Sequence, residues 1–122
     1  MGISISIVGL GVVGGACCFG FLKNGHDVTT YDTNPELGCD GEDDWVRVLE
    51  TEICYVCVPT PANEDGSCNT SIVESVVDDL ADSGYRGVVA IKSTVPPGTT
   101  KRIIERHTVS PKSFFKDMVF VP

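Results

Sequence analysis

Basic residues are scarce in this chain. Its 122 residues include 9 Lys and Arg against 17 Asp and Glu, which gives a net charge of −8. A nucleic-acid surface needs clustered lysines and arginines to neutralise phosphates, and the sequence contains no such cluster. We therefore expect no nucleic-acid partner, and an anionic ligand would have to be held mainly by backbone N–H groups.

The basic flank of a signal peptide or membrane segment is also missing. Ile3–Leu22 contains no charged residue, but no Lys or Arg precedes it, and glycines and serines interrupt it. We expect no membrane association and a cytoplasmic location. The chain has no internal repeat and no long linker, so residues 1–122 are expected to form a single domain with one core.

Six cysteines raise the alternatives of disulfides or a metal site. Cys54 and Cys57 lie in Ile53–Val58, which has the composition of a buried strand. Side chains three apart on a strand point to opposite faces, so this pair cannot share a metal ion. We expect no metal and six free thiols in a reducing compartment.

The clearest motif joins a strand to a helix near the N-terminus. The apolar run Ile3–Val8 leads directly into Gly9-Leu10-Gly11-Val12-Val13-Gly14. In this pattern the first glycine allows a sharp turn, the second lets the backbone approach a pyrophosphate, and the third lets the helix pack closely on the sheet. The unpaired N–H groups at the start of the helix favour phosphate, so the motif predicts a dinucleotide site.

An acidic residue supports the same prediction. Asp32 ends the predicted strand Asp27–Tyr31 and lies 18 residues after Gly14. Its carboxylate can accept hydrogen bonds from a ribose diol and would repel a 2′-phosphate, so we expect NAD rather than NADP.

The rest of the chain alternates strands with helices, which predicts an α/β, Rossmann-like doubly wound parallel sheet. Only about 20 residues separate Asp32 from the next strand at Ile53, too few for a helix, a strand and a second helix. We therefore expect about five strands in the order 2-1-4-5-6, with the third strand missing. A short helix is expected over 43–49, where Trp45 would anchor the core.

Two proline-containing loops follow the later strands. They are Val58-Pro59-Thr60-Pro61 and Lys92-Ser93-Thr94-Val95-Pro96-Pro97-Gly98-Thr99. Both leave the carboxyl ends of strands beside the glycine turn, where open α/β sheets bind ligands, and their rigid backbone would present the hydroxyls of Thr60, Ser93 and Thr94. With the glycine turn and Asp32, these loops make nearly the whole chain similar to the N-terminal domain of the UDP-glucose/GDP-mannose dehydrogenase family.

Enzymes of that family oxidise the C6 hydroxyl of a nucleotide sugar to a carboxylate by two hydride transfers to NAD. The resemblance implies that Thr94 helps to position a catalytic water and that the partner of the complete enzyme is a nucleotide sugar of the UDP-glucose or GDP-mannose type. It also implies a set of NAD-binding residues: Gly9, Leu10, Gly11, Val12, Val13 and Gly14 at the pyrophosphate, Asp32 at the adenosine ribose, Val58, Pro59, Thr60 and Pro61 along the cofactor, and Ser93 and Thr94 by the nicotinamide.

The chain departs from the family pattern in two places. Leu37 stands where the family often has a basic residue, so NAD affinity is expected to be weaker. The sequence ends at Pro122, before the family's catalytic cysteine and sugar-binding domain. We expect the chain alone to bind NAD without oxidising the sugar, and apolar surface near its end to allow homo-oligomers.

Two alternatives remain open. The β-hydroxyacid dehydrogenases share a similar glycine turn and an acid like Asp32, although the two proline loops disfavour them. A free-standing, non-enzymatic nucleotide-binding module would also carry these motifs.

Overall fold

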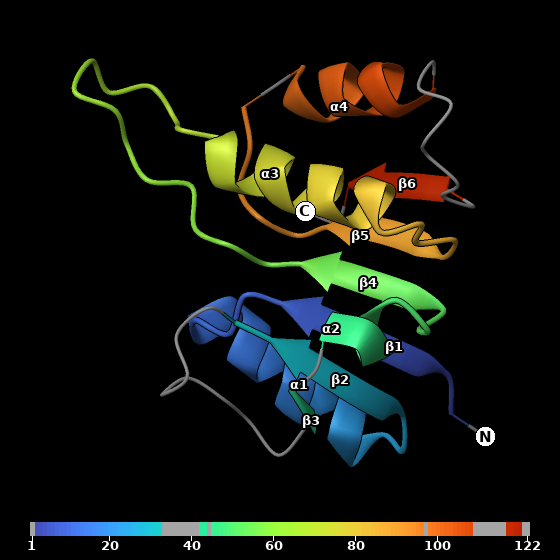
Figure 1. Cartoon of the computed structure of the whole chain (residues 1–122). Helices are drawn as coiled ribbons and strands as arrows, with labels where there is room; N and C mark the ends of the chain where they lie inside the picture. The colour runs from blue at the N-terminus through green and yellow to red at the C-terminus, as the bar shows by residue number, and fades with distance from the viewer. Residues whose placement is uncertain (1, 33–41, 44, 97, 109–116, 121–122) are drawn as a thin grey trace.

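The computed structural model describes residues 2–32, 42–43, 45–96, 98–108 and 117–120. These ranges form a six-stranded parallel sheet with helices on both faces (Figure 1). The elements in chain order are β1 (Ser4–Val8), α1 (Val12–Lys23), β2 (Asp27–Tyr31), β3 (Glu42–Asp43), α2 (Trp45–Val48), β4 (Ile53–Val56), α3 (Ser71–Asp82), β5 (Val88–Ile91), α4 (Thr99–Thr108) and β6 (Asp117–Phe120).

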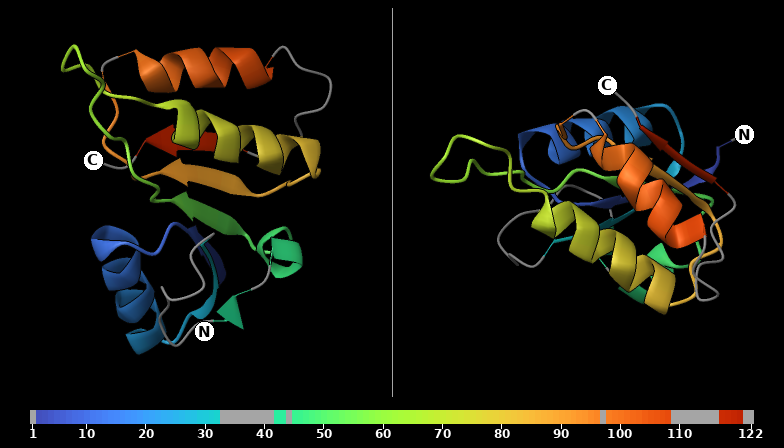
Figure 2. Two further views of the ribbon diagram at one scale, coloured as in Figure 1. Left: turned by 60° about the vertical axis from the view of Figure 1, so that its left-hand side comes forward. Right: turned by 90° about the horizontal axis from the view of Figure 1, so that it is seen from above.

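The two faces of the sheet carry separate cores. α2, α3 and α4 cover one face through a buried cluster that includes Val48, Val77 and Ile103. α1 covers the other face, where Cys18 packs with Ile5, among others. Figure 2 shows α1 and α2 on opposite sides of β1 and β2. The helices therefore change face where the chain passes from the β1–β2 half to the β4–β6 half, and the carboxyl edge beside β1 is the switch point at which such sheets bind ligands.

The strand order is β3-β2-β1-β4-β5-β6. The predicted doubly wound sheet and the order of its five longer strands are confirmed. The prediction that the outermost strand is missing is wrong in detail, because β3 pairs with β2 in a two-residue ladder, Thr29 with Glu42 and Thr30 with Asp43. The short connection has room for this much strand before α2 begins. Leu37 lies outside the described residues.

The cysteines follow the predicted geometry in most positions. Cys54 belongs to the core under α2–α4, whereas Cys57 packs on the α1 side, so the two thiols do face opposite ways. Cys17, Cys54, Cys57 and Cys68 are free. The prediction of free thiols is wrong at Cys18, which is disulfide-bonded; Cys39 lies outside the described residues. In the described part of the chain, no helix is both long enough and apolar enough to cross a membrane.

Candidate functional site

An open cleft of about 950 Å³ lies at the carboxyl edge of the sheet. It runs from the glycine turn across the ends of β2, β4 and β5 and along one side of α3. Ten predicted site residues line it: Gly9, Gly11, Val12, Val13, Asp32, Val58, Pro59, Thr60, Ser93 and Thr94. The structure thus brings both proline loops and the glycine turn to one place.

Three predicted residues are not among the lining residues. Leu10 is buried beneath the turn, with 4% of its surface exposed. Gly14 lies inside the packing between α1 and the turn, and Pro61 is exposed on the loop beyond Thr60. Leu10 and Gly14 therefore shape the turn from behind.

The three glycines of the turn differ in whether the fold itself would tolerate a side chain at their positions. Gly9 has φ +98°, and a Cβ there would lie 2.8 Å from the carbonyl of Cys57. A Cβ on Gly14 would lie 1.8 Å from the carbonyl oxygen of Gly9. Gly11 has an ordinary φ of −68°, and no atom of the described residues lies within 4 Å of a Cβ built on it. The described fold requires glycine at positions 9 and 14, whereas at position 11 it leaves an empty space that opens into the cleft.

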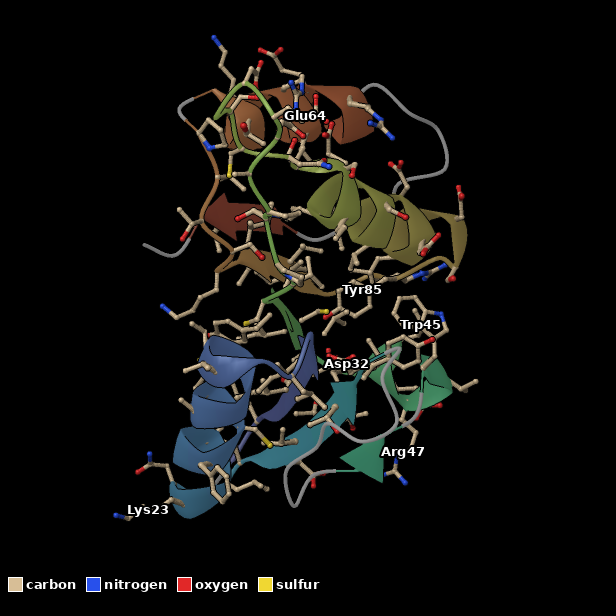
Figure 3. The ribbon with its side chains drawn as sticks, turned by 90° about the vertical axis from the view of Figure 1, so that its left-hand side faces the viewer. Lys23, Asp32, Trp45, Arg47, Glu64 and Tyr85 are labelled. Atoms are coloured by element: carbon tan, nitrogen blue, oxygen red, sulfur yellow. The ribbon has the colours of Figure 1, made fainter. Side chains whose placement is uncertain are left out.

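Asp32 lies in the cleft beside this turn (Figure 3). Its Oδ2 accepts a hydrogen bond of 2.8 Å from the backbone N–H of Leu10. The N–H of Gly9 donates to the carbonyl of Tyr31 at 2.9 Å. The end of β2 therefore holds the glycine turn by two hydrogen bonds, one of them charge-assisted.

The second proline loop is tied to the first. The Ser93 hydroxyl donates to the carbonyl of Val58 at 2.7 Å, and the Ser93 side chain is buried. The proton of the Ser93 hydroxyl is therefore donated to a protein carbonyl, which leaves only the oxygen lone pairs for a ligand, and the role of Ser93 beside the nicotinamide stays a prediction. Cys68 Sγ also bridges the loops, lying 3.5 Å from the Thr60 carbonyl oxygen and 3.8 Å from that of Thr94. Thr94 itself is exposed at the cleft.

Several lining residues were not predicted. Tyr31 and Trp45 line the cleft with their ring centroids 5.1 Å apart. Trp45 does pack against the core, as expected, but its other side faces the cleft. The remaining unpredicted residues come from α3 and the ends of β1, β4 and β5: Val8, Cys57, Ser71, Ile72, Ser75, Val76, Asp79 and Lys92. No local sequence motif identifies these residues as site residues. They reach the cleft only because the topology of the sheet brings their separate elements together.

Cys57 is the thiol that lines the cleft. Burial raises its pKa to about 12, the neighbouring Cys17 and Cys54 add to the rise, and Lys92 opposes it. Only the thiolate of cysteine is a strong nucleophile. Cys57 is therefore protonated near neutral pH and contributes to the wall of the cleft without being a candidate nucleophile.

Comparison with known proteins agrees with this geometry. Residues 42–119 match the model of the UDP-glucose/GDP-mannose dehydrogenase family, NAD binding domain. GDP-mannose 6-dehydrogenase of Pseudomonas aeruginosa is 26% identical in an alignment of 132 residues. The match covers 82% of this chain and 30% of that protein. UDP-glucose 6-dehydrogenase of Haloferax volcanii is 25% identical, with 84% of this chain and 31% of that protein covered.

Solved structures give the same relationship. A UDP-glucose dehydrogenase from Pyrobaculum islandicum superposes with a TM-score of 0.81 at 26% identity, covering 98% of this chain and 35% of that one. An imine reductase from Pseudomonas sp. shares the fold, with a TM-score of 0.70 at 16% identity. The chain spans about a third of the length of the dehydrogenases it matches. It belongs to the UDP-glucose/GDP-mannose dehydrogenase family, as an NAD-binding domain with a Rossmann-like fold.

Proposed function

We propose that the cleft at the carboxyl edge of the sheet holds NAD and that the chain serves a nucleotide-sugar 6-dehydrogenase. In this proposal the complete enzyme oxidises the C6 alcohol of a UDP- or GDP-linked sugar to a carboxylate. The names of the relatives support this substrate class, since they are dehydrogenases of GDP-mannose and of UDP-glucose.

The observation that carries the proposal is the space above Gly11. Backbone N–H groups at the start of α1 would meet a pyrophosphate there, and the helix dipole adds partial positive charge. The net charge of −8 favours such backbone binding, and among the described residues the cleft is lined by two acidic residues, Asp32 and Asp79, and by one lysine, Lys92.

The other residues follow in order along the cleft. Asp32 would accept hydrogen bonds from the adenosine ribose, and the loop of Val58, Pro59 and Thr60 would lie along the cofactor towards its nicotinamide. Bound NAD supplies the hydride acceptor. The chain's own contribution is to bind and orient it, with Ser93 holding the two loops together and the exposed Thr94 available to position a water molecule.

The test is to fill the space above Gly11. Gly11→Val should fold, because a side chain there meets no atom of the described residues, yet it should abolish NAD binding measured by calorimetry. Gly20→Val is the matched control, since Gly20 is on α1 and also has open space around its Cβ. A Gly11→Val protein that melts like the wild type and still binds NAD normally would overturn the assignment of the pyrophosphate.

A further inference from the structure

We propose that Trp45 and Tyr31 form the wall against which the purine base of a dinucleotide rests. This inference rests on the proposed function, because it takes the cleft to be the NAD site and identifies which side chains recognise its base.

The two aromatic residues come from different elements. Tyr31 is the last residue of β2, directly before Asp32, and Trp45 is the first residue of α2. Their ring centroids are 5.1 Å apart, with an angle of 59° between the ring planes. Both are half-buried, pack against the core with one side and line the cleft with the other. Figure 3 shows Trp45 on the side of α2 that faces α3. The core thus supports a rigid aromatic surface at the edge of the cleft.

The side of the cleft formed by α3 carries aliphatic residues. Ile72 and Val76 line the cleft and are four residues apart, so they lie on one face of the helix. Ile72 is 38% exposed, although it is a large apolar side chain. The cleft here has aromatic lining on one element and aliphatic lining on another, a combination suited to a flat, largely apolar group.

The order of groups along a dinucleotide places the base at this point. If the pyrophosphate lies over the glycine turn and the ribose at Asp32, the base carried by that ribose lies next, beside Tyr31 and Trp45. A further phosphate is disfavoured here, because the carboxylates of Asp32 and Asp79 both line the cleft. An amino-substituted purine is uncharged and can donate a hydrogen bond to an acceptor such as Asp79.

The sequence contains one tryptophan, so the tryptophan fluorescence of the protein comes from Trp45 alone. ADP-ribose and NAD should change the emission of Trp45 in a saturable way and protect it from quenching by acrylamide. Nicotinamide mononucleotide, which has no purine, should do neither. These measurements use the unaltered protein and so do not depend on the folding of a variant.

Substitution then measures what the wall contributes. Stacking of a base on an aromatic side chain corresponds to about 5- to 150-fold in affinity, so Trp45→Ala should weaken ADP-ribose binding by about 10-fold or more in calorimetry. Trp45→Phe should stay within about 3-fold of the wild type, since it keeps an aromatic face. Val46→Ala is the matched control, because Val46 is the next residue of α2, is 64% exposed and is not a lining residue.

The outcomes separate the two proposals. If the wild-type protein binds neither NAD nor ADP-ribose, the proposed function fails and the purine wall fails with it. If NAD binds and Gly11→Val abolishes that binding, but Trp45 emission is unchanged and Trp45→Ala binds as the wild type does, the purine wall is wrong and the proposed function stands.

Discussion

The carboxylate of Asp32 has a structural contact in addition to its proposed ligand. Its Oδ2 accepts the N–H of Leu10 at 2.8 Å, so the side chain holds the glycine turn. Removing the carboxylate would therefore affect both the proposed ribose site and the shape of the glycine turn. The two effects can be separated, because an asparagine keeps an acceptor oxygen but loses the charge.

We predict that Asp32→Ala weakens NAD binding by about 1–3 kcal/mol, the value of partly buried hydrogen bonds to a charged group. Asp32→Asn should lose less affinity for NAD, and it should narrow the preference for NAD over NADP because the repulsion of a 2′-phosphate is gone. Isothermal titration calorimetry with both dinucleotides measures this. Equal NAD affinity in all three proteins would remove Asp32 from the site.

A second prediction at this scale concerns the buried thiol of Cys54. Burial raises the pKa of Cys54 to about 12, although its hydrogen bond with Ser6 opposes the rise. The folded state therefore favours the protonated thiol. The stability that this contributes is complete below the ordinary cysteine pKa near 9 and is lost as pH rises towards about 12.

Urea unfolding measured between pH 7 and pH 11 tests this directly. The free energy of unfolding should be nearly constant up to about pH 8.5 and then fall, and Cys54→Ala should reduce the fall. Val89→Ala is a suitable control, because Val89 is equally buried beside Cys54 in β5 but cannot ionise. Equal alkaline slopes in the wild type and Cys54→Ala would contradict the prediction.

At the scale of elements, charged side chains join α3 to α4. Arg102 Nη2 lies 3.1 Å from Glu74 Oε2, and Arg106 pairs with both Glu74 and Asp78. The hydroxyl of Thr70 donates to the same Glu74 carboxylate at 2.9 Å. Glu74 is thus shared by three partners, two on α4 and one at the N-cap of α3, and it is only partly exposed.

We predict that Glu74→Ala lowers the free energy of unfolding by about 1 kcal/mol, the upper range for a partly exposed ion pair. The loss should shrink in 1 M salt, because screening weakens the pairs in the wild type. Lys101→Ala should have no measurable effect, since Lys101 and Glu105 are 4.0 Å apart and their side chains are 80% and 67% exposed. If Glu74→Ala left the free energy of unfolding unchanged at low salt, or lowered it equally at low and high salt, these ion pairs would not stabilise the protein.

Local signals explain which elements could be predicted from the sequence. The bounds of β2 match the predicted Asp27–Tyr31, and α2 lies within the predicted helix over 43–49. α1 ends at Lys23, where Asn24 is the C-cap and Gly25 has φ +83°, a conformation that glycine adopts readily. By contrast, a two-residue ladder such as β3 has no pattern of its own, since its formation depends on β2 lying beside it.

Tertiary contacts explain what was missed in the site. The glycine turn and the proline loops were visible as motifs, and the structure brings them to one cleft. The hydrogen-bond partner of the Ser93 hydroxyl could not be predicted from the sequence. The acceptor is the carbonyl of Val58, which lies in the loop after the neighbouring strand β4. Trp45 was predicted to be a core residue because the sequence does not show that Tyr31 and α3 meet it at the edge of the sheet.

At the scale of the whole molecule, the cleft connects the two halves of the sheet. Its lining residues come from the β1–β2 half and from the β4–β5 half, including α3. A ligand in the cleft would therefore contact both halves at once and stabilise the folded chain as a unit.

We predict that NAD at 100 times its dissociation constant adds about 2.7 kcal/mol to the free energy of unfolding. For a domain of this size, that corresponds to a rise in melting temperature on the order of 10 °C. Differential scanning fluorimetry measures the shift across an NAD titration. Gly11→Val should melt at one temperature with or without NAD, and a similar shift in that variant would place the stabilising site elsewhere.

The two-residue strand β3 has a consequence for how molecules meet one another. It forms one border of the sheet, and a border strand normally exposes a row of unpaired N–H and C=O groups that can recruit a strand from a second molecule. In the described part of the chain this border consists of Glu42 and Asp43 alone, which offer an added strand few groups to pair with. The shortened connection after β2 therefore also protects this side of the protein from aggregation by strand addition.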